Sequence, residues 1–370
     1  GDPRTKRAAG MLLDLFWAYW AQEQMGGIQG GGRSRISFHE ALQPNVEHGA
    51  TSLAWLHFDI GEQPAVYGHD MNAALSTYCP PAVVADIAVD VSGRGRYEVR
   101  QRPQGLGKNT RFQGTKVTDL RTDGGGILRY SYCDPSFIIG CPMTEARPLA
   151  DWAAISSQGR WQGVIFGGVH DARIVPMARP ENNIRGLNAQ WSVQSKGTLI
   201  TQKLTQHQGM AEMLVWMSKA GLSTPVEKNN VVFVEANDAY AAVRVIEGGF
   251  KWSEEIYTIT KPEGLVYRTR PGRTMVLNNE YSPVILEVMA KSDVANFESF
   301  QAEVSATKPR FNGKVLEYDT IYGDRLTLDT SYLQTPTING KLVDYSPRKL
   351  FESPFLNADY DTGVITISKG

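Results

Sequence analysis

The chain has few cysteines and no long apolar run. Its 370 residues include Cys79, Cys133 and Cys141, too few for a disulfide framework. We expect buried free thiols, with a Cys133–Cys141 pair as the alternative. No stretch approaches the roughly 20 apolar residues of a membrane span, and the sequence does not open with a cationic and then apolar leader. We therefore expect no membrane partner, whereas low cysteine use fits a periplasm and a cytoplasm equally.

Charge excess and cofactor motifs are also missing. The 38 basic and 39 acidic residues leave a net charge of −1, so the protein has no overall positive potential that would attract nucleic acid. An anionic ligand would need a local cluster of basic side chains. Neither CxxC nor HExxH occurs, so we expect no built-in metal site, although structural calcium stays open. The glycines near the N-terminus do not lead into G-K-[ST], so they do not form a phosphate loop, and we expect no cofactor.

A segment near the start of the chain is apolar on every side. From Ala8 to Met25 its Leu, Met, Ala, Phe, Tyr and Trp residues leave no polar face, so the pattern predicts an inner helix buried all round. Its polar residues, among them Glu23, gather at the C-terminal end. Gly26 and Gly27 follow, and a flexible run then leads to basic residues.

The glycine-rich loop has two interpretations. In one, the glycines form a helix cap and turn, and Arg33 and Arg35 are solvated. In the other, the glycines let the backbone approach a polar ligand whose oxygens both guanidiniums bind.

The fold class predicted from the patterns is α+β. Residues 1–91 read as a helical region with too few helices to enclose the opening one, which suggests a missing N-terminal helical portion or a contribution from another subunit. Residues 92–370 carry many short β-branched and aromatic runs divided by turn residues, which predict a large antiparallel β-sandwich. One helix is expected within it, from Asp293 to Val304.

Three stretches resemble a known family: Y-S-Y-C-D-P-S-F-I-I-G at 130–140, R-W-Q-G-V-I-F at 160–166 and N-N-E-Y-S-P-V-I-L-E-V at 278–288. With the helical region they resemble carbohydrate-active proteins built from an α/α toroid and a β-supersandwich, such as heparinase II/III-like polysaccharide lyases. The resemblance implies a secreted or periplasmic protein with a polysaccharide or oligosaccharide substrate. The chain departs from the family because most of the toroid is missing.

Such a lyase cleaves a uronate-containing polysaccharide by β-elimination. It must neutralise a carboxylate, remove the neighbouring proton and protonate the leaving oxygen. Arginine suits the first task, whereas tyrosine and histidine suit the others. The catalytic candidates are Tyr132, His170, His69 and Glu23, and the substrate-binding candidates are Arg33, Arg35, Tyr67, Trp161 and Arg160.

Each candidate also has a structural interpretation. Tyr130 and Tyr132 share one face of a strand, which is typical of sandwich core, and His69 would suit a helix cap. His170, beside Asp171, suits a loop imidazole with an orienting carboxylate. A glycoside hydrolase using Glu23 with Asp70 or Asp171 is an alternative function, because hydrolysis needs two carboxylates. A non-catalytic glycan-binding or scaffold module is another.

Overall fold

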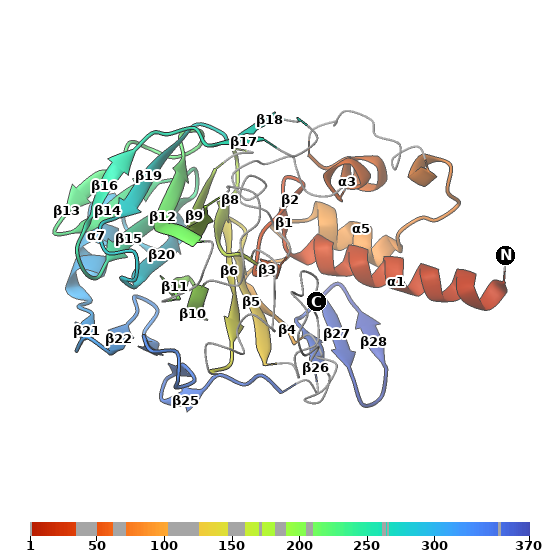
Figure 1. Cartoon of the computed structure of the whole chain (residues 1–370). Coiled ribbons are helices and arrows are strands. Elements are labelled where there is room, and N and C mark those ends of the chain that lie inside the picture. The colour runs from red at the N-terminus through yellow and green to blue at the C-terminus, as the bar shows by residue number, and fades with distance from the viewer. Residues whose placement is uncertain are drawn as a thin grey trace.

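The computed structural model describes residues 2–34, 50–61, 72–102, 126–146, 160–169, 172–181, 190–204, 210–260, 264, 266–346 and 349–370. Within these ranges the protein is rich in antiparallel sheet and has few helices, as expected for its fold class (Figure 1). The helices are α1 (Pro3–Gln22), α3 (Ala50–Phe58), α5 (Ala82–Val89), α7 (Phe297–Ala306) and the 3₁₀ turn η1 (Lys291–Asp293).

One large sheet forms the centre of the molecule. Its eleven strands are, in spatial order, β16 (Phe250–Ser253), β19 (Gly272–Leu277), β12 (Met210–Ser218), β9 (Arg173–Pro180), β8 (Gly163–Phe166), β6 (Phe137–Thr144), β5 (Ile127–Asp134), β4 (Tyr97–Gln101), β26 (Lys349–Glu352), β27 (Leu356–Asp359) and β28 (Ile365–Ile367).

A six-stranded sheet faces it, in the order β10 (Gln190–Ser195), β11 (Thr198–Lys203), β20 (Val284–Ala290), β15 (Ala239–Val245), β14 (Val231–Glu235) and β13 (Val226–Lys228). A five-stranded sheet follows near the C-terminus, made of β21 (Arg310–Phe311), β22 (Val315–Asp319), β23 (Arg325–Asp329), β24 (Thr337–Ile338) and β25 (Lys341–Leu342). The remaining pairs are β1 (Gln24–Met25) with β2 (Ile28–Gln29), β3 (Arg33–Ser34) with β7 (Arg160–Trp161), and β17 (Thr258–Thr260) with β18 (Val266–Arg268).

The large sheet is apolar on both faces because it separates two cores. Adjacent residues of a strand point to opposite faces, so Ile139 packs in the core between the large and six-stranded sheets, whereas Ile138 packs in the core beneath the helices. Val164 and Ile165 divide in the same way. The outer face of the six-stranded sheet is covered by α7, which begins at the Asn296 cap rather than at Asp293. Among the described residues, the helices, the large sheet, the six-stranded sheet and α7 therefore form four successive layers.

The opening helix is only partly an inner helix, which corrects the prediction from its apolar composition. Trp17, Ala18 and Trp20 are buried, but Met11 and Leu12 nearer the N-terminus are exposed. Figure 1 shows this half of α1 extending beyond α5, away from the sheets. Among the described residues, the helices form one layer on the large sheet and no toroid. The domain boundary near residue 91 stays a prediction.

All three cysteines are free, as predicted, but only Cys133 and Cys141 are buried, because Cys79 is exposed. None of the described helices is long and apolar enough to cross a membrane.

Candidate active site

The C-terminal end of α1 is held firmly against the large sheet. Buried Arg94 donates one hydrogen bond to the carbonyl oxygen of Ala21 (2.6 Å), which the end of the helix leaves without a partner, and another to the carbonyl oxygen of Gln24 in β1 (2.9 Å). Gly26 and Gly27, both at positive φ, form the turn of the β1–β2 hairpin directly after the helix. The side chain of Glu23, between helix and hairpin, is therefore fixed in position.

The next glycines allow the loop to lie flat on the sheet. A Cβ at Gly32 would overlap the backbone of Cys141 in β6, and one at Gly30 would collide with Ile138. Gly31, at φ +82°, lies so close to Glu23 and Ser131 that a side chain there would meet both. The close approach that these glycines permit is thus an approach to β5 and β6.

Glu23 is the centre of a buried polar cluster, which we call the junction cluster and define as Tyr19, Glu23, Arg33, Arg129, Ser131 and Trp161. The Ser131 hydroxyl of β5 donates a hydrogen bond to Glu23 Oε1, while Glu23 Oε2 has no hydrogen-bond partner among the described residues. Tyr19 lies one turn before Glu23 on the same face of α1. Arg129 shares its face of β5 with Ser131 and donates a hydrogen bond to Gln101 (3.1 Å).

The environment shifts the proton affinities in this cluster. Burial raises the pKa of Glu23 to about 7, although the Ser131 hydrogen bond, the Tyr19 hydroxyl and the charges of Arg33 and Arg129 all act to lower it. Burial, followed by the negative charge of Glu23, raises the pKa of the Tyr19 phenol well above its usual range. A carboxyl that is half ionised near neutral pH therefore faces a phenol that keeps its proton.

Arg33 is buried rather than solvated, which corrects the first interpretation of the loop. Strand β3 pairs with β7, placing Arg33 directly opposite Trp161. The guanidinium lies 5.5 Å from the centre of the Trp161 ring, at cation–π distance. The sequence thus predicted Glu23, Arg33 and Trp161 as site residues, and the structure brings these three together. Arg160 pairs with Ser34 through its backbone, and its side chain is not described.

Tyr132 lies elsewhere, on the opposite face of β5 from Ser131. It belongs to the core between the sheets, with its ring 5.8 Å from that of Tyr322. Burial raises the pKa of Tyr132 to about 12, although Arg96 lowers it. The structure therefore separates Tyr132 from Glu23 and Arg33, because neighbouring residues of a strand alternate between its faces.

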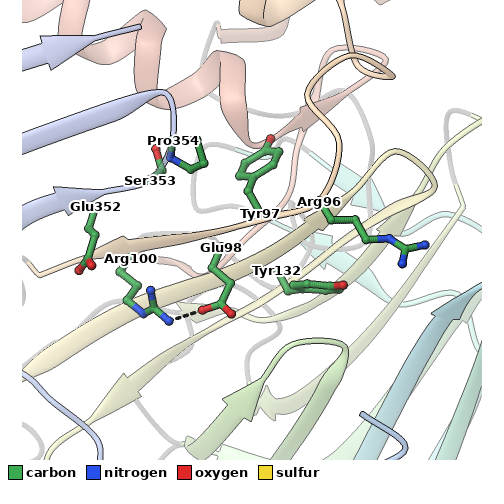
Figure 2. Close-up of a pocket in the computed structure, with 8 residues that line it drawn as sticks. All are labelled: Arg96, Tyr97, Glu98, Arg100, Tyr132, Glu352, Ser353 and Pro354. Carbon is green, nitrogen blue, oxygen red and sulfur yellow. Dashed lines mark hydrogen bonds and ion pairs between the residues drawn. The ribbon is translucent and has the colours of Figure 1, made fainter. Parts of the chain in front are cut away.

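Tyr132 instead lines a groove of about 460 Å³ at the edge of β4 (Figure 2). We call it the edge groove; its lining residues are Arg96, Tyr97, Glu98, Arg100, Tyr132, Glu352, Ser353 and Pro354. Figure 2 shows Tyr97 on one side of β4 and Glu98 with Tyr132 on the other. β26 pairs with β4 only at Gln101 and Arg100, so the groove forms where this pairing ends.

The charges of the edge groove are compensated. Arg96 forms ion pairs with Asp134 (2.5 Å) and Asp293 (2.6 Å), and Arg100 pairs with Glu98. The groove is linked to the junction cluster through α1, because Tyr97 donates a hydrogen bond to the Gln22 carbonyl oxygen and Ser353 donates one to the Gln22 side chain (2.6 Å).

Several predicted site residues lie outside the described residues: His69, His170, Arg35 and Tyr67, together with Asp70 and Asp171 of the hydrolase alternative. Their roles stay predictions. Conversely, Tyr19, Arg129 and Ser131 were not predicted. Their signals were the spacing of Tyr19 and Glu23, four residues apart on a helix, and the alternation of Arg129 and Ser131 with Tyr130 and Tyr132. Among the described residues, His, Cys, Asp and Glu form no group of three or more suited to a metal ion.

Comparisons with known proteins give little further information. No family model matches the chain, and no curated protein matches it. Among solved structures, the chain is similar to a heparinase III gene product at 10% sequence identity with a TM-score of 0.18. The match covers 60% of this chain but 27% of that protein, so the chain spans about a quarter of its length. Such a TM-score is too low to establish a common fold, and the function of this chain has to be argued from its own residues.

Proposed function

We propose that the protein is a secreted or periplasmic carbohydrate-active enzyme that cleaves a uronate-containing polysaccharide by β-elimination at the junction cluster. One observation carries the proposal: a buried carboxyl, Glu23, with a pKa of about 7, lies beside a phenol and two guanidiniums. A pKa near the working pH is what a general base requires. Arginine is the side chain best suited to hold a carboxylate.

The residues divide the reaction between them. Arg33 and Arg129 neutralise the uronate carboxylate, which makes the proton on the adjacent carbon more acidic. Glu23 takes that proton, and the released electron pair forms a double bond to the next carbon as its bond to the bridging oxygen breaks. The Tyr19 phenol gives its proton to the departing oxygen. Proton transfer from Glu23 to Tyr19 then restores both groups.

In this proposal a substrate reaches the cluster from the side of Tyr19 and Arg129. Both are only partly buried, whereas Glu23 is 2% exposed and Arg33 8% exposed. A sugar ring approaching from this side would meet Tyr19 and Arg129 first. The Trp161 ring on the far side of Arg33 holds the guanidinium in place.

The proposal is tested by incubating the protein with a panel of uronate-containing glycans and following near-ultraviolet absorbance. A rise marks the unsaturated product of elimination, and kcat/KM should increase with pH through about 7 as Glu23 ionises. Glu23→Gln, which keeps the shape and can still accept the Ser131 hydrogen bond, should lower kcat by at least about 100-fold. Full activity of this variant would eliminate Glu23 as the base.

Two alternatives predict other results. A non-catalytic glycan-binding or scaffold module is favoured by the compensated charges of the edge groove and the burial of Glu23, and it predicts glycan binding without a new product. A glycoside hydrolase would release reducing ends without absorbance. Its second carboxylate, Asp70 or Asp171, lies outside the described residues, so this alternative stays a prediction.

A further inference from the structure

The N-terminal half of α1 has its polarity reversed relative to a surface helix. Its outward side chains are apolar and exposed: Met11 is 53% exposed, Leu12 67%, Leu13 40% and Phe16 42%. A surface helix normally directs such residues inward and its polar residues to solvent. The outward residues of this helix instead have the composition of an interface.

The inward side of the same helix already has neighbours. The Asp14 carboxylate accepts a hydrogen bond from the Tyr78 hydroxyl (2.9 Å), and the Trp17 ring packs edge-on against Phe58 at 5.2 Å. At 3.6 residues per turn, the exposed apolar residues from Ala8 to Phe16 cover an arc of about 200° on the opposite side. Figure 1 shows α3 and α5 on one side of α1.

We propose that this outer face of α1 docks an amphipathic helix of a partner protein, apolar along its centre and acidic along its edges. By helical spacing, the exposed face continues into Tyr19, whose ring lies 5.7 Å from that of Phe351 in β26, so it is continuous with the side of α1 that packs on the large sheet. A helix laid against Leu12 and Phe16 would extend that packed side toward the N-terminus.

The acidic character of the partner follows from charge. Arg4, Lys6 and Arg7 stand in the first turns of α1, and within the part of the chain that the structure describes none of them forms an ion pair. By helical spacing, Arg4 lies near one edge of the apolar arc and Lys6 near the other. Glutamates flanking the apolar centre of a partner helix would therefore meet a lysine or an arginine on both sides.

A second copy of this chain is a poor fit for that role. Of its described helices, α7 carries Glu298 and Glu303, but its apolar residues Phe300 and Val304 are already buried against the six-stranded sheet. The other described helices, α1, α3 and α5, carry few acidic residues. A separate protein with an acidic amphipathic helix is the better match.

A labelled synthetic helix tests the proposal by fluorescence anisotropy. The probe is a 21-residue peptide with leucine at heptad positions a and d and glutamate at e and g, and its control carries lysine at e and g. The glutamate peptide should bind the protein at least tenfold more tightly than the lysine peptide. A Leu12→Glu and Phe16→Glu double variant should lose that binding, with circular dichroism showing that its fold is intact.

Leu342→Glu provides the matched control, because Leu342 is also 67% exposed but lies on β25, and it should bind the peptide as the wild type does. Equal binding of the two peptides, or unchanged binding by the double variant, would overturn the proposal. So would concentration-dependent self-association in sedimentation that the double variant abolishes, which would identify a second copy. Binding to phosphatidylglycerol vesicles with no preference between peptides would overturn it in favour of a membrane surface.

Discussion

The guanidinium of Arg33 lies 5.5 Å from the ring centre of Trp161, a residue 128 positions further along the chain, because β3 and β7 pair directly at these two residues. The contact closes the glycine-rich loop onto the large sheet. It also buries a positive charge beside Glu23, whose pKa that charge lowers. The loop thus contributes to the stability of the junction as well as to its electrostatics.

Trp161→Ala should destabilise the protein strongly. Trp161 is 1% exposed, so removing its ring leaves a cavity and removes the cation–π contact with Arg33. We expect the free energy of unfolding to fall by about 3 to 5 kcal/mol. Urea denaturation followed by circular dichroism measures this. Trp252→Ala is the comparison, since Trp252 is 37% exposed and its loss should amount to about 1 kcal/mol or less. Equal losses in the two variants would mean that Trp161 is not buried as described.

Two glycine substitutions should have opposite effects on stability. Gly32→Ala places a methyl group against the backbone of Cys141, which cannot move without disturbing β6, so we expect a loss of more than about 2 kcal/mol. Gly10→Ala lies within α1, where a Cβ would meet nothing within 4 Å, and should gain about 0.5 to 1 kcal/mol from helix propensity. Thermal unfolding reports both. A stable Gly32→Ala protein would show that the loop does not lie on the sheet.

Stability should decrease as pH rises through the titration of Glu23. Its pKa is about 7 in the folded protein and near 4.5 when unfolded, so between these values the folded state holds more protons. The free energy of unfolding therefore falls with rising pH across this window. Between these two pKa values, this group alone lowers the free energy of unfolding by about 3 kcal/mol. Glu287, buried in the smaller sheet, has its pKa raised to about 7 as well and acts in the same direction.

Denaturation midpoints measured from pH 5 to pH 8 test this effect. Glu23→Gln should flatten the decline, and combining it with Glu287→Gln should flatten it further. An unchanged slope in the double variant would mean that other groups control stability in this range.

Much of the fold could be predicted from the sequence. The antiparallel strands within residues 92–370 and the helix α7 were predicted, because β-branched alternation and helical spacing are local signals. The central strand β9 (Arg173–Pro180) has no such clear signal. Pro176 in its middle argues against a buried strand, since proline cannot donate a ladder hydrogen bond. Only its pairing with β12 and β8 in the structure identifies β9 as a buried central strand.

The candidate site was less accessible to sequence reasoning. Glu23, Arg33 and Trp161 could be chosen by residue type, but their partners depend on which face of β5 meets α1. A shift of one residue would have presented Tyr132 to Glu23 in place of Ser131. The exposure of Leu12 could not be predicted either, because the sequence of a helix that is apolar on every side does not show which side packs against other elements.

Two tyrosine substitutions test which phenol serves the proposed elimination. Tyr19→Phe removes the proton that we assign to the leaving oxygen and should lower kcat at least about 100-fold with a small change in KM. Tyr132→Phe should retain nearly full activity, because its hydroxyl lies in the edge groove on the other face of the sheet. Both variants keep their aromatic rings, so their unfolding midpoints should stay close to that of the wild type. The reverse result, with Tyr132→Phe inactive and Tyr19→Phe active, would move the reaction from the junction cluster to the edge groove and remove Glu23 from the mechanism.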